Sequence, residues 1–241
     1  MSMPRRVLFP TMLALTTALL VGCTATPQAA PEVIDLASTL SFDFLLEQDD
    51  GMDQILKITN SGQQAVAPVL RFTALDKAGE PIPGVVAYSV FGTERGRLVV
   101  PAGDTYELMR FSGKREAEVA DVAVRIEKAP QADFPAVRAG VAATPLDEAG
   151  KKADLDAETA RVRLTNDNEA PVTVRVLYAV WEMPENRPEG VQERQQVWSA
   201  FPIGDLITVP AKGDTAVPMT EGWNKSEYAK APTSLLVFYS R

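Results

Sequence analysis

Cys23 is the only thiol in the chain of 241 residues, and the chain contains no histidine. Without histidine it cannot assemble a Cys-His or Ser-His-Asp nucleophile, a histidine general base or a histidine-ligated zinc site. A single cysteine also excludes an intrachain disulfide. The chemistry that remains available uses carboxylates, lysine, methionine thioethers or a modification of Cys23 itself.

Cys23 ends a segment with the features of a secretory signal peptide. Arg5 and Arg6 precede an apolar stretch, residues 7–21, that is too short to span a membrane as a stable helix. The stretch ends in Leu20-Val21-Gly22-Cys23, which resembles the bacterial lipobox. The resemblance implies cleavage after Gly22 and attachment of a diacylglyceryl group, with acyl chains such as palmitate, to the Cys23 thiol. An ordinary secretory signal with an incidental cysteine is the alternative.

The charge of the chain indicates how the protein is held at a membrane. The chain has 24 basic and 32 acidic residues, and removal of residues 1–22 takes away two arginines and no acid, so the formal charge changes from −8 to −10. An acidic protein is repelled by anionic headgroups and by nucleic acid, so we expect attachment through acyl chains and no nucleic-acid partner. Residues 23–31 are predicted to form a lipidated tether.

The lipobox resemblance also bears on location. Residue 24 is threonine rather than the aspartate that retains enteric lipoproteins at the inner membrane, so the resemblance implies the outer membrane in an organism with two membranes. We therefore expect a lipid anchor in the cell membrane or the outer membrane, with the protein facing outside the cytoplasm.

The remainder of the chain contains one internal repeat. Asn60 aligns with Asn166, and the match continues without a gap to Val85 and Val191. Two later matches keep the same order: Tyr88-Ser89-Val90-Phe91 with Trp198-Ser199-Ala200-Phe201, and Pro101-Ala102-Gly103-Asp104 with Pro210-Ala211-Lys212-Gly213-Asp214. A spacing of about 106 residues predicts two domains of the commonest size, which we place at residues 32–129 and 132–241.

Both copies have the pattern of β-strands. Val172, Val174, Val176 and Tyr178 alternate with Thr173, Arg175 and Leu177, a period of two residues. Turn residues such as Ser61-Gly62 and Asp167-Asn168 separate the short apolar runs. Because helical periodicity is absent, we predict an all-β fold with two tandem immunoglobulin-like β-sandwich domains after the signal peptide.

A local motif supports this fold. The run Phe72-Thr73-Ala74-Leu75-Asp76 is followed by a glycine-containing turn, and Tyr178-Ala179-Val180-Trp181-Glu182 is a degraded version of it. The pattern is similar to the FxLYD-type domains of bacterial envelope proteins. The resemblance covers about half of each repeat and implies a sandwich fold outside the cytoplasm, with no catalytic residue to carry over.

Two groups of residues offer ligands to a metal. The run Asp49-Asp50-Gly51-Met52-Asp53 contains oxygen ligands for calcium, but its spacing differs from that of an EF-hand and a solvated hairpin turn explains it. Cuprous copper would bind methionine thioethers, yet Met52, Met109, Met183 and Met219 are scattered along the chain. We therefore predict no metal site and no cofactor.

The aromatic residues divide into predicted core and predicted contact residues. Tyr88 and Trp198, and likewise Phe91 and Phe201, occupy matching positions and are expected in the domain cores. Trp223 lies in a polar segment outside the repeat, and the second copy has an insertion that contains Glu193 and Arg194. Recognition residues are common in loops, so Trp223, Arg194 and Glu193 are the predicted partner contacts. Packing of the Trp223 segment on its own domain is the alternative.

Two classes of function remain. The first is a lipid-anchored cell-envelope protein, not an enzyme, that acts as a protein-binding, regulatory or structural module with another envelope protein as its partner. The second is an envelope carrier of a ligand or metal, or a carboxylate-based enzyme that uses Asp104 or Asp214. A turn role already explains why the same acid occurs in both copies, so we favour the first class.

Overall fold

The computed structural model describes residues 34–46, 53–92, 97–155, 159–181, 196–219 and 232–241. These residues belong to one compact unit that begins at Val33. The predicted signal peptide, Cys23 and the tether lie outside the described residues. Within the described part, no helix has the length and apolar character needed to cross a membrane.

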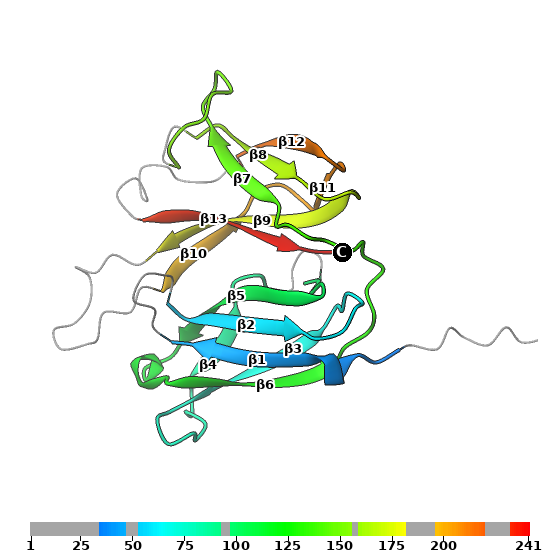
Figure 1. Cartoon of the computed structure of the whole chain (residues 1–241). Helices are drawn as coiled ribbons and strands as arrows, with labels where there is room; N and C mark the ends of the chain where they lie inside the picture. The colour runs from blue at the N-terminus through cyan, green and yellow to red at the C-terminus, as the bar shows by residue number, and fades with distance from the viewer. Residues whose placement is uncertain (1–33, 47–52, 93–96, 156–158, 182–195, 220–231) are drawn as a thin grey trace, which may run out of the picture. The chain divides into compact units, whose positions relative to one another are not determined.

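Strands of the first copy form two antiparallel sheets (Figure 1). The larger sheet has the order β1-β2-β5-β4, and β3 pairs with β6 in the smaller one. Their bounds are β1 Leu40–Leu45, β2 Ile55–Asn60, β3 Val69–Leu75, β4 Val86–Ser89, β5 Gly103–Ser112 and β6 Asp121–Lys128, with 3-10 turns at Ala37–Thr39 and Glu116–Glu118. Alternate residues of β2 are buried, and Leu56 and Ile58 are fully inaccessible, as expected for a strand with one face on the core.

The second copy also forms two antiparallel sheets (Figure 1). One sheet has the order β7-β8-β12, and in the other β9 pairs with β10, β11 and β13. Their bounds are β7 Ala142–Leu146, β8 Arg161–Asn166, β9 Val172–Trp181, β10 Val197–Pro202, β11 Ile207–Val209, β12 Gly213–Pro218 and β13 Thr233–Tyr239. The all-β sandwich fold is thus confirmed, whereas the number of domains and their boundaries stay predictions.

The two copies differ at one strand. The sequence alignment equates β4 with β10, but β4 pairs with β5 whereas β10 pairs with β9, the counterpart of β3. After β3 the chain turns back, and the N–H group of Ile82 donates to the Ala74 carbonyl at 3.0 Å. Beyond Ile82 the chain moves away from β3. The flanking Pro81 and Pro83 have no N–H group with which to continue a ladder beside β3. Gly84 then adopts a φ of 77°, and β4 begins two residues later.

Strand β9 is buried on both of its faces, because every residue from Val174 to Trp181 is buried. Val174, Val176 and Tyr178 belong to the core of the second copy. The alternate residues Leu177, Ala179 and Trp181 join a cluster with residues of the first copy, including Phe91 and Leu108. The near-continuous burial of β9 therefore results from apolar contact between the two copies.

The segment between the copies is also packed. The N–H group of Leu36 donates to the Ala129 carbonyl at 2.8 Å, and that of Ala132 donates to the Ala65 carbonyl at 2.7 Å. Ala129 and Ala132 are both buried. Backbone hydrogen bonds and burial therefore hold this connection against the first copy.

Candidate functional site

The aligned asparagines Asn60 and Asn166 have the same structural role. Asn60 Nδ2 donates to the carbonyls of Gln64 at 2.8 Å and Val100 at 3.1 Å. Asn166 Nδ2 donates to three carbonyls, those of Ala170 at 2.9 Å, Val209 at 3.2 Å and Pro210 at 3.0 Å. Both asparagines are buried, and each donates to one fully buried carbonyl, that of Val100 or Val209, and to part-buried turn carbonyls.

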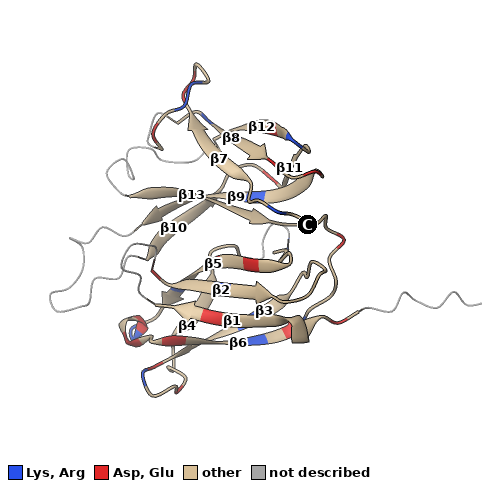
Figure 2. Ribbon diagram, viewed as in Figure 1, with Lys and Arg blue, Asp and Glu red and all other residues tan. Residues whose placement is uncertain are grey.

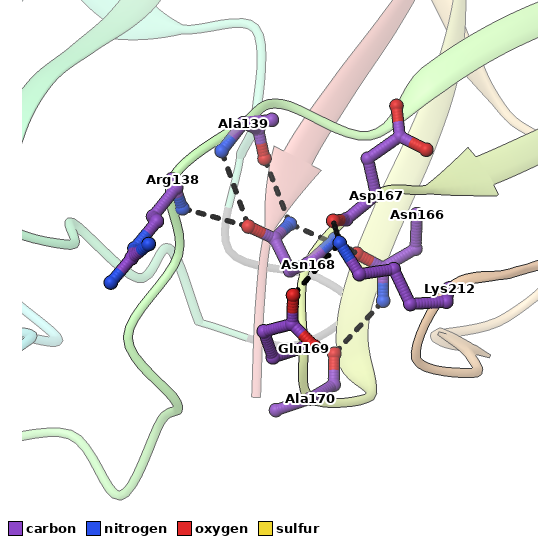
Figure 3. A network of polar contacts seen from close by, with 8 residues as sticks. All are labelled: Arg138, Ala139, Asn166, Asp167, Asn168, Glu169, Ala170 and Lys212. Carbon is purple, nitrogen blue, oxygen red and sulfur yellow. Dashed lines mark hydrogen bonds and ion pairs between the residues drawn. The ribbon is translucent and has the colours of Figure 1, made fainter.

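Asn168 extends this network in the second copy (Figure 3). Its Oδ1 accepts the N–H groups of Arg138 at 2.7 Å and Ala139 at 3.2 Å, and its Nδ2 donates to the Ala139 carbonyl at 2.8 Å. Lys212 Nζ donates to the Asp167 carbonyl at 2.6 Å and lies 2.9 Å from Glu169 Oε1. The asparagine side chains point into the turn and bond to the chain's own backbone, so the cluster stabilises the fold and offers little to a ligand.

We predict that Asn166→Ala and Asn60→Ala each lower the free energy of unfolding by about 2 kcal/mol, because the buried carbonyl of Val209 or of Val100 loses its side-chain donor. Urea denaturation of the purified variants measures both changes. Gln63→Ala, at an exposed position beside the first turn, is the control and should change stability by less than about 0.5 kcal/mol. Equal stability of Asn166→Ala and the wild type would contradict the assigned role.

The two acids considered for catalysis lie on exposed strand positions. Asp104 Oδ1 accepts the Thr59 hydroxyl at 2.7 Å, and its Oδ2 lies 3.0 Å from Lys57 Nζ. The Thr59 hydrogen bond and then the Lys57 ammonium lower the pKa of Asp104, which is the wrong direction for a general acid or base near neutral pH. Asp214 is exposed and lies opposite Thr165 in the β8–β12 ladder.

Most of the residues predicted to contact a partner or to offer metal ligands lie outside the described part of the chain. Trp223, Arg194, Glu193 and Cys23 lie outside the described residues, as do Met52, Met183 and residues 49–52 of the acidic run. Met109 is buried in the apolar cluster. Among the described residues, no three carboxylate or thiol side chains lie close enough together to hold a metal ion.

The prediction that Tyr88 and Trp198 lie in the cores is wrong. Tyr88 is 37% and Trp198 44% exposed, whereas in the other matched pair Phe91 is buried and Phe201 is partly buried against the second core. Both aromatic residues lie on edge strands, at positions where the alternation of the strand directs the side chain outward. Sequence similarity within the repeat had shown that the positions correspond but not which face they occupy.

A groove of about 670 Å³ opens beside β3 and β4, and residues of β9 and β10 continue its wall. Its volume lies within the range of typical ligand sites, roughly 300–1,000 Å³. Apolar residues of the wall include Leu70 and Phe72 of β3 and Val86 and Tyr88 of β4. Val86 is 60% exposed, which makes it the most exposed large apolar side chain among the described residues.

The charged lining of the groove is mainly basic. Among the described residues it comprises Arg71, Arg110 and Arg175 and one acid, Glu127, in a chain with a formal charge of −8. Arg71 Nε lies 2.7 Å from Glu127 Oε1, and the Arg110 guanidinium carbon lies 5.4 Å from the centre of the Tyr88 ring. Arg175 is the one basic residue of β9 (Figure 2). The groove therefore differs in charge from the protein as a whole.

Arg175 is part of a buried polar link between the two copies. Its guanidinium carbon lies 5.0 Å from the centre of the Phe91 ring, and its Nη1 donates to the Phe91 carbonyl. The N–H group of Phe91 in turn donates to Glu107 Oε1 at 3.1 Å. Through the peptide groups of Phe91, a side chain of the second copy is thus connected to β5 of the first.

Burial determines the ionisation of Glu107, which is only 1% exposed. Desolvation raises the pKa of Glu107 to about 8, although the N–H groups of Phe91 and Leu108, the Ser89 hydroxyl and the charge of Arg175 oppose the shift. Sequence reasoning missed this residue. The sequence did contain a signal for a buried carboxyl group: Glu107 lies on the same face of the strand as Met109 and Phe111. A charged side chain is unusual on such an apolar face.

Comparison of the chain with protein-family models, with curated proteins and with solved structures found no match.

Proposed function

We propose that this chain is a lipid-anchored cell-envelope protein that binds another envelope protein and does not catalyse a reaction. The observation that carries the binding role is the groove beside β3, whose wall exposes Val86 and Tyr88. Exposed apolar side chains that gather at a concave surface with a few polar groups are typical of recognition sites. The lipobox resemblance of residues 20–23 supports the anchor.

The anchor and the groove suggest complementary roles. Acyl chains on Cys23 would hold the protein at the cell membrane or the outer membrane, facing outside the cytoplasm, and the groove would select the partner. We propose Trp223, Arg194 and Glu193 as further contacts, since they lie in segments particular to the second copy.

The volume of the groove favours one alternative, an envelope carrier of a small anionic ligand. A cavity of about 670 Å³ is large enough for such a molecule, and three arginines line it. The two roles differ in what the groove retains after purification. A carrier would release a small molecule that mass spectrometry detects, whereas a protein-binding module would be isolated with its groove empty.

We predict that a photo-crosslinking residue at Val86 captures a protein partner in intact cells, because that side chain is exposed on the groove wall. A second probe at Trp223 tests the predicted contact there. A probe at the exposed Lys151, which does not line the groove, is the matched control. The expected result is one discrete higher-mass adduct from Val86 or Trp223 and none from Lys151. Absence of any adduct from both positions would contradict a protein-binding role.

A further inference from the structure

We infer that the groove receives an extended acidic segment of a partner protein, which pairs as an added antiparallel strand with the free edge of β3. The inference rests on the proposed binding function and specifies the chemistry of the partner. Three observations lead to it: a strand edge with no partner among the described residues, an occupied counterpart of that edge in the second copy, and the charge of the groove.

The edge of β3 that faces away from β6 has backbone groups available for pairing. The Ala74 carbonyl points to this side, because it accepts the N–H group of Ile82 there. In an antiparallel strand alternate residues direct both backbone groups the same way, so the N–H and C=O of Phe72 share this direction. Within the described part of the chain, neither group of Phe72 has a backbone partner outside the β3–β6 ladder.

The second copy shows what occupies such an edge. There β10 lies along β9, with Phe201 opposite Tyr178, and Tyr178 is the residue that aligns with Phe72. The strand that the alignment equates with β10 is β4, which has joined β5 instead. Among the described residues, the first copy therefore has the edge without the strand that covers it in the second. A peptide in the position of β10 would complete the same sheet.

The walls of the groove determine which peptide fits. Strand addition gains its affinity from backbone hydrogen bonds and its specificity from the side chains that flank the added strand. Here those side chains are apolar at Val86 and Tyr88 and basic at Arg71 and Arg110. An extended segment that alternates apolar and acidic residues matches both, since carboxylates pair with arginines in charge-assisted hydrogen bonds.

Electrostatics also argue against a second copy of this chain as the occupant. The formal charge is −8 for the full chain and −10 for the chain cleaved after Gly22, and like-charged molecules repel at the distances over which association begins. An acidic segment of a partner is attracted by the local excess of arginine, although the groove belongs to an acidic protein.

The probes for the test are two synthetic peptides, acetylated and amidated, with four Val-Glu or four Val-Lys repeats. Full-length protein purified in detergent is titrated with each, and amide hydrogen exchange is followed by mass spectrometry. We expect the Val-Glu peptide to bind and to slow exchange at the Phe72 amide, and the Val-Lys peptide not to bind. N-methylation of alternate residues along one edge of the Val-Glu peptide should weaken binding at least tenfold, because the backbone donors are lost.

Two matched variants test the position of the site. Arg71 and Arg125 lie opposite each other in the ladder and both contact Glu127, but only Arg71 lines the groove. Arg71→Gln should therefore weaken binding of the Val-Glu peptide roughly fivefold, and Arg125→Gln should leave it unchanged. Val86→Asp adds a negative charge to an exposed wall position, where folding is not at risk, and should reduce binding further.

Several results would overturn the inference: equal binding of both peptides, equal effects of Arg71→Gln and Arg125→Gln, or slowed exchange on another edge such as β1. Dimerisation of the protein through Val86, seen by analytical ultracentrifugation and lost in Val86→Asp, would identify a second copy as the occupant and would also overturn it. If the crosslink from Val86 captures a partner while the acidic peptide does not bind, the proposed function stands and only the strand-addition inference fails.

Discussion

Replacement of Cys23 by alanine is expected to release the protein from membranes completely and to abolish incorporation of labelled palmitate. The lipobox resemblance makes the Cys23 thiol the acceptor of the acyl chains, and the net acidic chain has no electrostatic attraction to anionic headgroups. One acyl chain gives only marginal binding, whereas two or three chains give stable anchoring, so loss of the acceptor removes the whole anchor.

Cell fractionation and metabolic labelling with an alkyne analogue of palmitate measure the two effects. Thr24→Ala changes the neighbouring side chain while leaving the acceptor in place, so that variant should stay labelled and sediment with membranes. Palmitate retained by Cys23→Ala would show that the lipobox interpretation is wrong.

The second large effect is expected at Glu107. The folded protein holds this carboxyl group protonated up to a pKa of about 8, whereas the unfolded chain releases the proton near 4.5. Between these values the folded state binds more protons, so the contribution of Glu107 to the free energy of unfolding is greatest below about pH 4.5 and is lost as the pH rises to about 8. The loss is at most about 5 kcal/mol, at 1.36 kcal/mol for each pKa unit.

Glu107→Gln removes this titration while keeping an oxygen that accepts the N–H groups of Phe91 and Leu108. Its free energy of unfolding, measured by urea denaturation, should rise above that of the wild type progressively from pH 5 to pH 8. Glu118→Gln is the control, because the pKa of this exposed carboxyl is lowered by Arg115 and it stays ionised throughout the window. A constant difference between Glu107→Gln and the wild type would contradict the assignment.

Much of the fold could be predicted from the sequence. The alignment of Asn60 with Asn166 identified two residues with equivalent hydrogen bonds to the carbonyls of Val100 and Val209, and the strands that end at them, β2 and β8, correspond in the two copies. This was possible because strand patterns and turn residues are local properties, and local periodicity of two directly reflects which side chains share a face.

The candidate site was less accessible to sequence reasoning. Tyr88 was expected in a core and is exposed, and Arg175, which the alternation placed opposite the core residues of β9, is buried against Phe91. The alternation showed correctly that Arg175 and Val174 face opposite ways. It contained no sign that the second face would also be covered, since that depends on residues of the other copy about 80 positions away along the chain.

The sequence by itself determined the strands, the repeat, the turns at the two asparagines and the absence of histidine and disulfide chemistry. Only the tertiary structure decided that β4 joins β5 while β10 joins β9, and hence that one edge of β3 borders an open groove. The physical reason is that strands pair through backbone groups that nearly every residue carries, so the pattern of side chains does not show which strand will lie beside which. The neighbouring strand is determined by which apolar faces become buried together, and these faces come from distant parts of the chain.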